Sequence, residues 1–270
     1  MSQKDPHLPP LRGGPLLARG DGRGKKGRRF LWVAAVLLFS LAIATALYAI
    51  SNARCFTLVG EIVCRVETDE PMVALTFDDG PTDRGVDTAL AALRAGGARA
   101  TFFLIGREVG ERPHLVRRIL AEGHEVANHS LTHQMMIGRS AGFYDMEIGE
   151  THRRLIAAGA PAPRLFRPPY GKKLWGLPAA ARRHGYKMVM IDVEEPVVGD
   201  ARAYADRIVR EAKPGSILLM HLMYRANGTA REALPLVIRG LQRRGFRIVP
   251  VGQLLAASGG DGLPADAVRR

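Results

Sequence analysis

Two acidic residues and two histidines carry the clearest chemical signal in this sequence. Asp78 and Asp79 directly follow the apolar, β-branched run 72–77, and His129 and His133 lie four residues apart further along the chain. A run that ends in Asp-Asp-Gly-Pro is typical of a buried strand followed by a turn, and α/β folds place their chemistry at the carboxyl ends of such strands. Histidines four apart on a helical turn share one face, so both can bind one cation.

A metal site is the interpretation that these four residues favour together. Two histidines and one carboxylate with open positions suit a catalytic zinc, and the same ligands also suit non-haem iron. Adjacent residues of an extended chain point to opposite sides, so Asp78 and Asp79 are expected to differ in role. Either motif alone is equally compatible with a surface turn and two ordinary polar histidines.

Two further segments end in residues suited to the same chemistry. Arg167 begins the run Arg-Pro-Pro-Tyr-Gly, which predicts an extended turn at a strand end. An arginine there could orient a catalytic carboxylate, and a backbone N–H in the turn could face a developing oxyanion. The apolar run 216–220 ends at His221, whose ordinary pKa of about 6.5 suits a general acid.

In this order the segments resemble the motifs of the NodB-homology polysaccharide deacetylases, carbohydrate esterase family 4. The resemblance extends from about residue 71 to residue 255. It implies that Asp78 is the catalytic base and that Asp79, His129 and His133 are the metal ligands. The implied ion is a divalent metal, with Zn²⁺ the first choice and Co²⁺ or another divalent ion the alternative.

The same resemblance implies roles for four more residues. Arg167 would position the catalytic base, and the backbone N–H of Tyr170 would help to bind the oxyanion beside the substrate. Leu219 would line the pocket for the acetyl methyl group, and His221 would be the general acid.

The fourth motif departs from the family pattern. The family has an acidic residue that tunes the catalytic histidine, followed by Asp-Trp, whereas this chain has the run 192–196 with no tryptophan. Glu194 is the expected counterpart of the tuning residue, and Asp192 is the alternative. A third reading takes these residues as ordinary loop acids.

The implied activity is metal-dependent hydrolysis of the N-acetyl amide of an N-acetylated polysaccharide, of peptidoglycan or chitin type, with release of acetate. Such an enzyme is a hydrolase that acts on carbon–nitrogen bonds other than peptide bonds. Two alternatives stay open: a glycan-binding pseudoenzyme that keeps the fold, and a small-molecule amide or ester hydrolase.

Strand-like and helix-like runs alternate through the rest of the chain, which predicts parallel β/α units in one domain, 71–256. Seven strands are expected, and they match the distorted (β/α)₇ barrel that the resemblance implies; a doubly wound open sheet is the alternative. The expected strands are 72–77, 100–105, 125–127, 165–166, 187–191, 216–220 and 246–251. The expected helices are 86–95, 115–122, 143–158, 201–212 and 230–244.

The N-terminal part of the sequence predicts a membrane anchor. Residues 1–29 are basic and rich in Gly and Pro, which predicts a disordered cytoplasmic tail. Residues 30–50 are apolar apart from one Ser and one Thr, and this length is about that needed to span a bilayer as a helix. The basic flank predicts a cytoplasmic N-terminus and a periplasmic or extracellular catalytic domain in a single-pass protein of the plasma membrane. A signal peptide cleaved at 44–46, giving a secreted form, is the alternative.

The two cysteines suit export. Cys55 and Cys64 flank a stretch that predicts a hairpin within 51–70, with the two residues opposed closely enough to form a disulfide, as in oxidising compartments. Residues 257–270 are expected to form a flexible tail. The net charge is +13, and from residue 30 onward 31 basic residues face 24 acidic ones. This excess suits an anionic envelope polymer or membrane, and the absence of a nucleic-acid-binding motif excludes nucleic acid as the expected partner.

Overall fold

The computed structural model describes residues 22–197 and 199–257 of the chain. Contacts divide the chain into two compact units, residues 1–46 and residues 47–270. Most of the predicted basic tail and nearly all of the predicted C-terminal tail lie outside the described residues. Helix α1, Gly22–Asn52, begins within the segment expected to be disordered, because Lys and Arg are good helix formers that extend an adjoining apolar helix.

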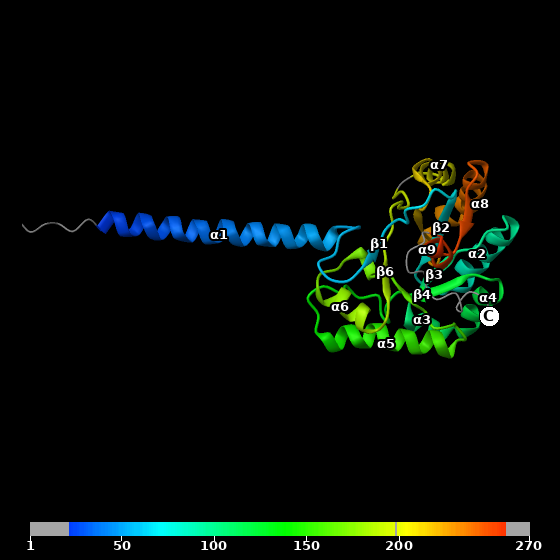
Figure 1. Cartoon of the computed structure of the whole chain (residues 1–270), viewed down its shortest axis with the longest axis horizontal. Coiled ribbons are helices and arrows are strands. Elements are labelled where there is room, and N and C mark those ends of the chain that lie inside the picture. The colour runs from blue at the N-terminus through cyan, green and yellow to red at the C-terminus, as the bar shows by residue number, and fades with distance from the viewer. Residues whose placement is uncertain (1–21, 198, 258–270) are drawn as a thin grey trace, which may run out of the picture. The chain divides into compact units, whose positions relative to one another are not determined.

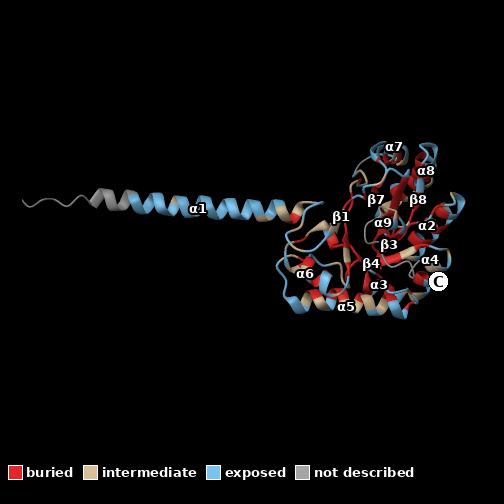
Figure 2. Ribbon diagram, in the orientation of Figure 1, coloured by how far each residue is buried: buried red, intermediate tan, exposed pale blue. Residues whose placement is uncertain are grey.

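The described part of the first unit is a single helix without a buried face. Large apolar side chains such as Phe30, Leu37 and Leu41 are exposed. Most of the described part of α1 is accordingly coloured as exposed in Figure 2. By length and composition, the segment Arg28–Asn52 could cross a membrane. The predicted span 30–50 lies within it, and such a helix fits a single-pass membrane anchor or a signal anchor.

The second unit is built on an eight-stranded sheet whose named strands pair in parallel (Figure 1). The strand order is β1-β6-β5-β4-β3-β2-β7, with β8 paired to β2. Seven of the strands were predicted, and β1 lies within the predicted hairpin, which gave it the wrong partner. The strands are β1 Ile62–Val63, β2 Met72–Asp78, β3 Thr101–Leu104, β4 Glu125–Asn128, β5 Leu165–Phe166, β6 Lys187–Val189, β7 Ile217–His221 and β8 Arg247–Val249.

Two isolated bridges close this sheet on itself. Leu218 of β7 pairs with Leu75 of β2 and also forms a parallel bridge with Val193, which follows β6. Arg65, which follows β1, forms an antiparallel bridge with Ser216, the residue before β7. The result is a distorted barrel rather than the doubly wound open sheet.

Helices cover the barrel, and five of them were predicted from sequence. Three of these begin at polar residues, Thr82, Ser140 and Asp200, whose side chains accept a hydrogen bond from the first helical turn. Helices α7 and α8 lie side by side (Figure 1). The helices are α2 Asp83–Ala95, α3 Gly106–Glu111, α4 Pro113–Ala121, α5 Ala141–Ala157, α6 Gly176–Arg183, α7 Ala201–Glu211, α8 Gly228–Arg243 and α9 Val251–Ala256, with 3₁₀ turns at Pro169–Gly171 and Arg225–Asn227.

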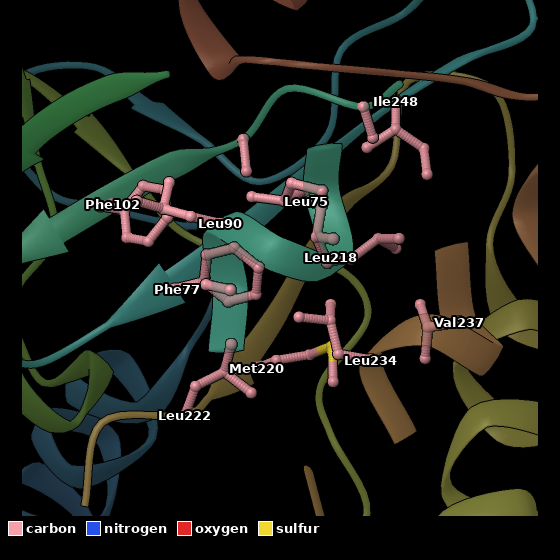
Figure 3. Packing of buried hydrophobic residues seen from close by; sticks show 14 of the residues in the cluster. Leu75, Phe77, Leu90, Phe102, Leu218, Met220, Leu222, Leu234, Val237 and Ile248 are labelled. Atoms are coloured by element: carbon pink, nitrogen blue, oxygen red, sulfur yellow. The ribbon is translucent and has the colours of Figure 1, made fainter. Parts of the chain in front are cut away.

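Strand β2 is buried on both faces, and its alternation decides where the acidic pair points. Leu75 and Phe77 pack outward among core residues of the sheet and helices, including Leu234 of α8 (Figure 3). Met72 and Ala74 face the barrel interior. Because side chains alternate along a strand, Asp78 continues this inward face at the carboxyl end of β2.

The predicted hairpin around the cysteines is wrong. Cys55 and Cys64 form a disulfide with their Cα atoms 5.4 Å apart, but the intervening residues form a loop. Thr57 hydrogen bonds locally with the backbone of Val59, and Ile62–Val63 pairs instead with β6 as a parallel edge strand. The backbone groups that a hairpin would have used are therefore bonded elsewhere.

Candidate active site

The acidic pair stands at the end of β2, and both carboxylates turn toward His129. Asp79 has a positive φ of 77°, so the chain leaves the extended conformation at this residue. Asp79 Oδ1 lies 3.8 Å and Asp78 Oδ2 lies 3.7 Å from His129 Nε2. The strict opposition expected of adjacent strand residues fails here, because the left-handed residue redirects the second side chain.

The two histidines lie in the loop after β4, and the predicted helical turn is wrong. Ser130 and His133 have φ values of 66° and 57°, which a helix does not contain. Asn128 Oδ1 accepts a hydrogen bond from Ser130 N, and Ser130 Oγ accepts one from His133 N. These bonds fold the loop so that the rings of His129 and His133 lie 5.0 Å apart.

Glu147 of α5 is a site residue that sequence reasoning missed. Its buried carboxylate accepts hydrogen bonds from Leu131 N, Thr132 N and Thr132 Oγ1, at 2.8, 2.9 and 2.6 Å. Because these donors lie between the two histidines, Glu147 holds the ligand loop in place. An acidic residue at a buried helical position, next to Ile148, was the signal that could have found it.

Three side chains converge as a metal site would require. The ligand atoms of Asp79, His129 and His133 lie within 4.8 Å of one another. Asp79 Oδ1 is buried and has no hydrogen-bond partner among the described residues, and it lies 3.5 Å from His133 Nε2. An orphaned buried carboxylate oxygen facing two imidazole nitrogens fits a divalent cation.

The protonation states of His129 and Asp79 also fit a bound cation. Burial lowers the pKa of His129 to about 4, so its imidazole is neutral. His129 Nδ1 lies 2.9 Å from the carbonyl oxygen of Arg167 and donates to it, which leaves the Nε2 lone pair for a metal. Burial and the neighbouring charge of Asp78 raise the pKa of Asp79 to about 6, and a bound cation would relieve both effects.

Asp78 is held as an ion by Arg167. Arg167 Nη1 donates to Asp78 Oδ1 at 2.6 Å and to Thr76 Oγ1 at 2.9 Å, and its guanidinium stacks 4.0 Å from the ring centroid of Phe103. Burial acts to raise the pKa of Asp78, but the charge and hydrogen bond of Arg167 and the nearby imidazole of His221 hold it below its ordinary value. The structure thus brings together the arginine and the carboxylate that the sequence paired.

His221 ends β7 beside an acidic partner, but that partner is Glu195. His221 Nδ1 donates to Glu195 Oε1 at 2.6 Å, and the His221 backbone N–H donates to Oε2 at 2.9 Å. The Tyr204 hydroxyl also donates to this carboxylate. Burial lowers the pKa of His221, but the hydrogen bond to Glu195 and the charges of Asp78, Glu195 and Asp79 outweigh it and raise the pKa to about 9.

The tuning residue expected at Glu194 is therefore corrected to Glu195. Val193 forms a parallel bridge with Leu218, and this register brings Glu195 alongside His221 while Glu194 points elsewhere. Glu194 forms an ion pair with Arg54. Asp192, the alternative, accepts hydrogen bonds from Ser216 Oγ and Ile217 N and so fixes the start of β7.

A cleft of about 390 Å³ is shared by Asp78, Arg167, His221 and the two histidines after β4. Leu219 is buried in its wall, and Tyr170 stands at its rim, 60% exposed, with its ring 4.8 Å from that of His133. Tyr170 has a φ of 58° within the turn Pro169–Gly171, a strained conformation of the kind found at functional sites. The cleft is lined by Asn52, Arg54, Asp78, His129, His133, Arg167, Pro168, Tyr170, Gly171, Met190, Ile191, Glu194, Leu219 and His221.

Comparisons with known proteins agree with this geometry. The polysaccharide deacetylase family model matches residues 65–189. A peptidoglycan-N-acetylglucosamine deacetylase of Bacillus cereus is 31% identical over 73% of this chain and 93% of that protein. A chitooligosaccharide deacetylase of Bradyrhizobium is 37% identical over 67% of this chain and 90% of that protein.

A solved structure shows that the fold is shared as well. A CE4 family pseudoenzyme from Bacillus anthracis is 27% identical and superposes with a TM-score of 0.68, over 74% of this chain and 70% of that one. The closed parallel barrel, the Asp-His-His cluster and these relatives lead to one conclusion: this chain belongs to the NodB-homology polysaccharide deacetylases, carbohydrate esterase family 4.

Proposed function

We propose that this protein removes the acetyl group from an N-acetylated glycan of the cell envelope, of peptidoglycan or chitin type, releasing acetate and leaving a free amine. The observation that carries the proposal is the position of Asp78 between the Arg167 guanidinium and the Asp79-His129-His133 cluster, in one cleft with His221. The two relatives described above are a peptidoglycan-N-acetylglucosamine deacetylase and a chitooligosaccharide deacetylase, which supports this substrate class.

In the proposed reaction, Asp78 takes the proton of the attacking water. Arg167 keeps Asp78 ionised and oriented, so the carboxylate is available as a base near neutral pH. His221, whose pKa is raised by Glu195, then donates a proton to the departing amine nitrogen. The backbone N–H of Tyr170 would donate to the oxyanion, and Leu219 would contact the acetyl methyl group.

Asp79, His129 and His133 would hold a divalent cation, for which Zn²⁺ is the proposed identity and Co²⁺ or another divalent ion the alternative. When bound, the cation supplies Lewis acidity that polarises the amide carbonyl and makes water more acidic. Both imidazoles have pKa values lowered by burial, so no proton must leave them before binding.

We also propose that residues 30–50 anchor the protein in the plasma membrane, with its N-terminus in the cytoplasm and the catalytic domain 71–256 on the outer side. Envelope glycans lie on that side. The disulfide between Cys55 and Cys64 suits the oxidising conditions there.

A glycan-binding pseudoenzyme is the alternative that the altered fourth motif favoured. Glu195 supplies a carboxylate to His221 despite the altered motif, which weighs in favour of an active enzyme. The discriminating experiment measures acetate release from N-acetylglucosamine tetramer by the full-length protein in detergent, after metal removal and after addition of Zn²⁺.

Two variants complete that experiment. Asp78→Asn should abolish acetate release, because the amide cannot accept the proton of water. Asp87→Asn removes a carboxylate that pairs with Arg118 on the surface, and it should leave the rate unchanged. Zinc-independent release, or equal rates in the two variants, would contradict the proposed function.

A further inference from the structure

The segment that directly follows the apolar part of α1 forms one wall of the catalytic cleft. Asn52 and Arg54 line the cleft together with Asp78 and His221. Arg54 lies four positions after Ile50, so it is at most about 14 Å along the chain from the last apolar residue of the helix.

Two lysines fasten this wall to the catalytic domain. Lys173 is 1% exposed, and its ammonium donates to the carbonyl oxygen of Ala53, while its backbone N–H donates to the carbonyl oxygen of Ser51. Lys172 donates to the side chain of Asn52. Because an ammonium is buried only where it has a partner, this arrangement fixes the segment against the domain rather than leaving it as a free linker.

Arg54 is the arginine that a ligand in the cleft can reach. Among the described residues that line the cleft, the arginines are Arg54 and Arg167. Arg167 is 3% exposed and is committed to Asp78, whereas the Arg54 side chain is 48% exposed. An anionic group that enters the cleft would therefore meet the guanidinium of Arg54.

A carboxylate or phosphate group of a ligand can replace Glu194 as the partner of Arg54. Arg54 pairs with Glu194, whose side chain is 46% exposed, and water screens a half-exposed pair so that it stabilises the fold little. Guanidinium groups bind carboxylate and phosphate groups in a planar, two-pronged geometry. Glu194 is also adjacent to Glu195, the partner of His221, so this ion pair lies next to the reacting centre.

We propose that Arg54 is a specificity-determining residue that releases Glu194 and binds an anionic group of the glycan substrate beside the sugar that is deacetylated. The inference rests on the proposed function and narrows its substrate class to glycans with a carboxylate or phosphate close to the N-acetyl group. The carboxylate could belong to a muramoyl sugar, and the phosphate to a lipid-diphosphate-linked sugar at the membrane.

The test compares three substrates with the full-length zinc protein in detergent: neutral N-acetylglucosamine tetramer, a muramoyl-containing peptidoglycan fragment and an N-acetyl sugar linked to a lipid diphosphate. Arg54→Ala should lower kcat/KM about tenfold on an anionic substrate, mainly through KM, and less than twofold on the neutral tetramer. Arg54→Lys should show an intermediate loss, because an ammonium lacks the planar fork. Dependence on only one anionic substrate identifies the source of the anion.

Glu194→Gln separates anion binding from a structural role. If Arg54 binds an anion, removal of its competitor should raise kcat/KM on the anionic substrate about two- to threefold, opposite in sign to Arg54→Ala. Arg153→Ala, which breaks a surface pair with Glu150 on α5, is the matched control and should change nothing.

Three results would overturn the inference. Arg54→Ala could lower kcat/KM equally on neutral and anionic substrates, or leave it unchanged on both. Alternatively, Arg54→Ala and Glu194→Gln could change kcat/KM on the anionic substrate in the same direction. In each case, release of acetate from the neutral tetramer by the parent protein would leave the proposed deacetylase function standing.

Discussion

Removal of the Glu195 carboxylate should shift the alkaline limb of the pH–rate profile. In the proposed mechanism, His221 must be protonated, so activity falls as pH rises through its pKa. Glu195 is the largest of the effects that raise this pKa to about 9, against burial, which lowers it. In Glu195→Gln the pKa of His221 should therefore fall toward its ordinary value of about 6.5.

The size of the effect follows from the two pKa values. At pH 8 a histidine of pKa about 9 is roughly nine-tenths protonated, and one of pKa about 6.5 is roughly 3% protonated, so kcat/KM should fall by up to about thirtyfold. Below about pH 6 both forms are protonated and the rates should approach each other. A bound cation would lower the pKa of His221 in both proteins, so the shift between the two proteins is the quantity to compare.

The assay is the pH profile of kcat/KM for acetate release from the neutral N-acetylglucosamine tetramer by the zinc-loaded protein. Glu194→Gln is the matched control, since it removes the adjacent carboxylate that pairs with Arg54 instead. The alkaline limb of the Glu194→Gln profile should lie at the same pH as that of the parent protein. An unshifted limb in Glu195→Gln, or a shift in Glu194→Gln, would refute the assignment of Glu195 to His221.

Three further changes test the metal cluster and its supports. Asp79→Asn should abolish zinc retention on dialysis, yet it should stabilise the metal-free protein at pH 8 by up to about 3 kcal/mol. The folded pKa of about 6 lies above the ordinary value, so Asp79 favours folding only in its protonated form; this contribution is fully present below about pH 4 and is lost as the pH rises through 6, and calorimetry checks the sign. Arg167→Met should destabilise by roughly 3–5 kcal/mol in urea titrations because it leaves the Asp78 charge buried alone, and adding Asp78→Asn should restore stability without activity. Glu147→Ala should weaken zinc affinity about 10- to 100-fold in a competition assay with a chromogenic chelator while the domain stays folded.

The sheet and the acidic pair could be predicted because their signals are local. The run 72–77 is short and almost wholly apolar, as is typical of a strand buried on both faces, and the Asp-Asp-Gly-Pro that follows marks its carboxyl end. The helices with polar N-caps and strong apolar periodicity were expected for the same reason. Strand β1, Ile62–Val63, was expected to pair within a hairpin, because nothing local in the sequence shows that its partner is the distant β6.

The errors concern relations that only the assembled barrel decides. The sequence offers three acids in the run 192–195, and the bridge between Val193 and Leu218 selects Glu195 as the one beside His221. The turn between the two histidines depends on positive φ values and on the distant Glu147, neither of which a four-residue spacing contains. The four-residue spacing identified His129 and His133 as a pair, but it could not predict the backbone conformation of the loop that carries them.

The most direct test of the central claim is a titration of Zn²⁺ into the metal-free, full-length protein in detergent, with bound zinc and acetate release from the tetramer measured in the same samples. Activity should rise in proportion to bound zinc and stop rising at one equivalent per chain, the number that the single Asp79-His129-His133 cluster of the described residues can hold. Full activity before zinc is added, or zinc bound at one equivalent with no acetate released, would contradict the account.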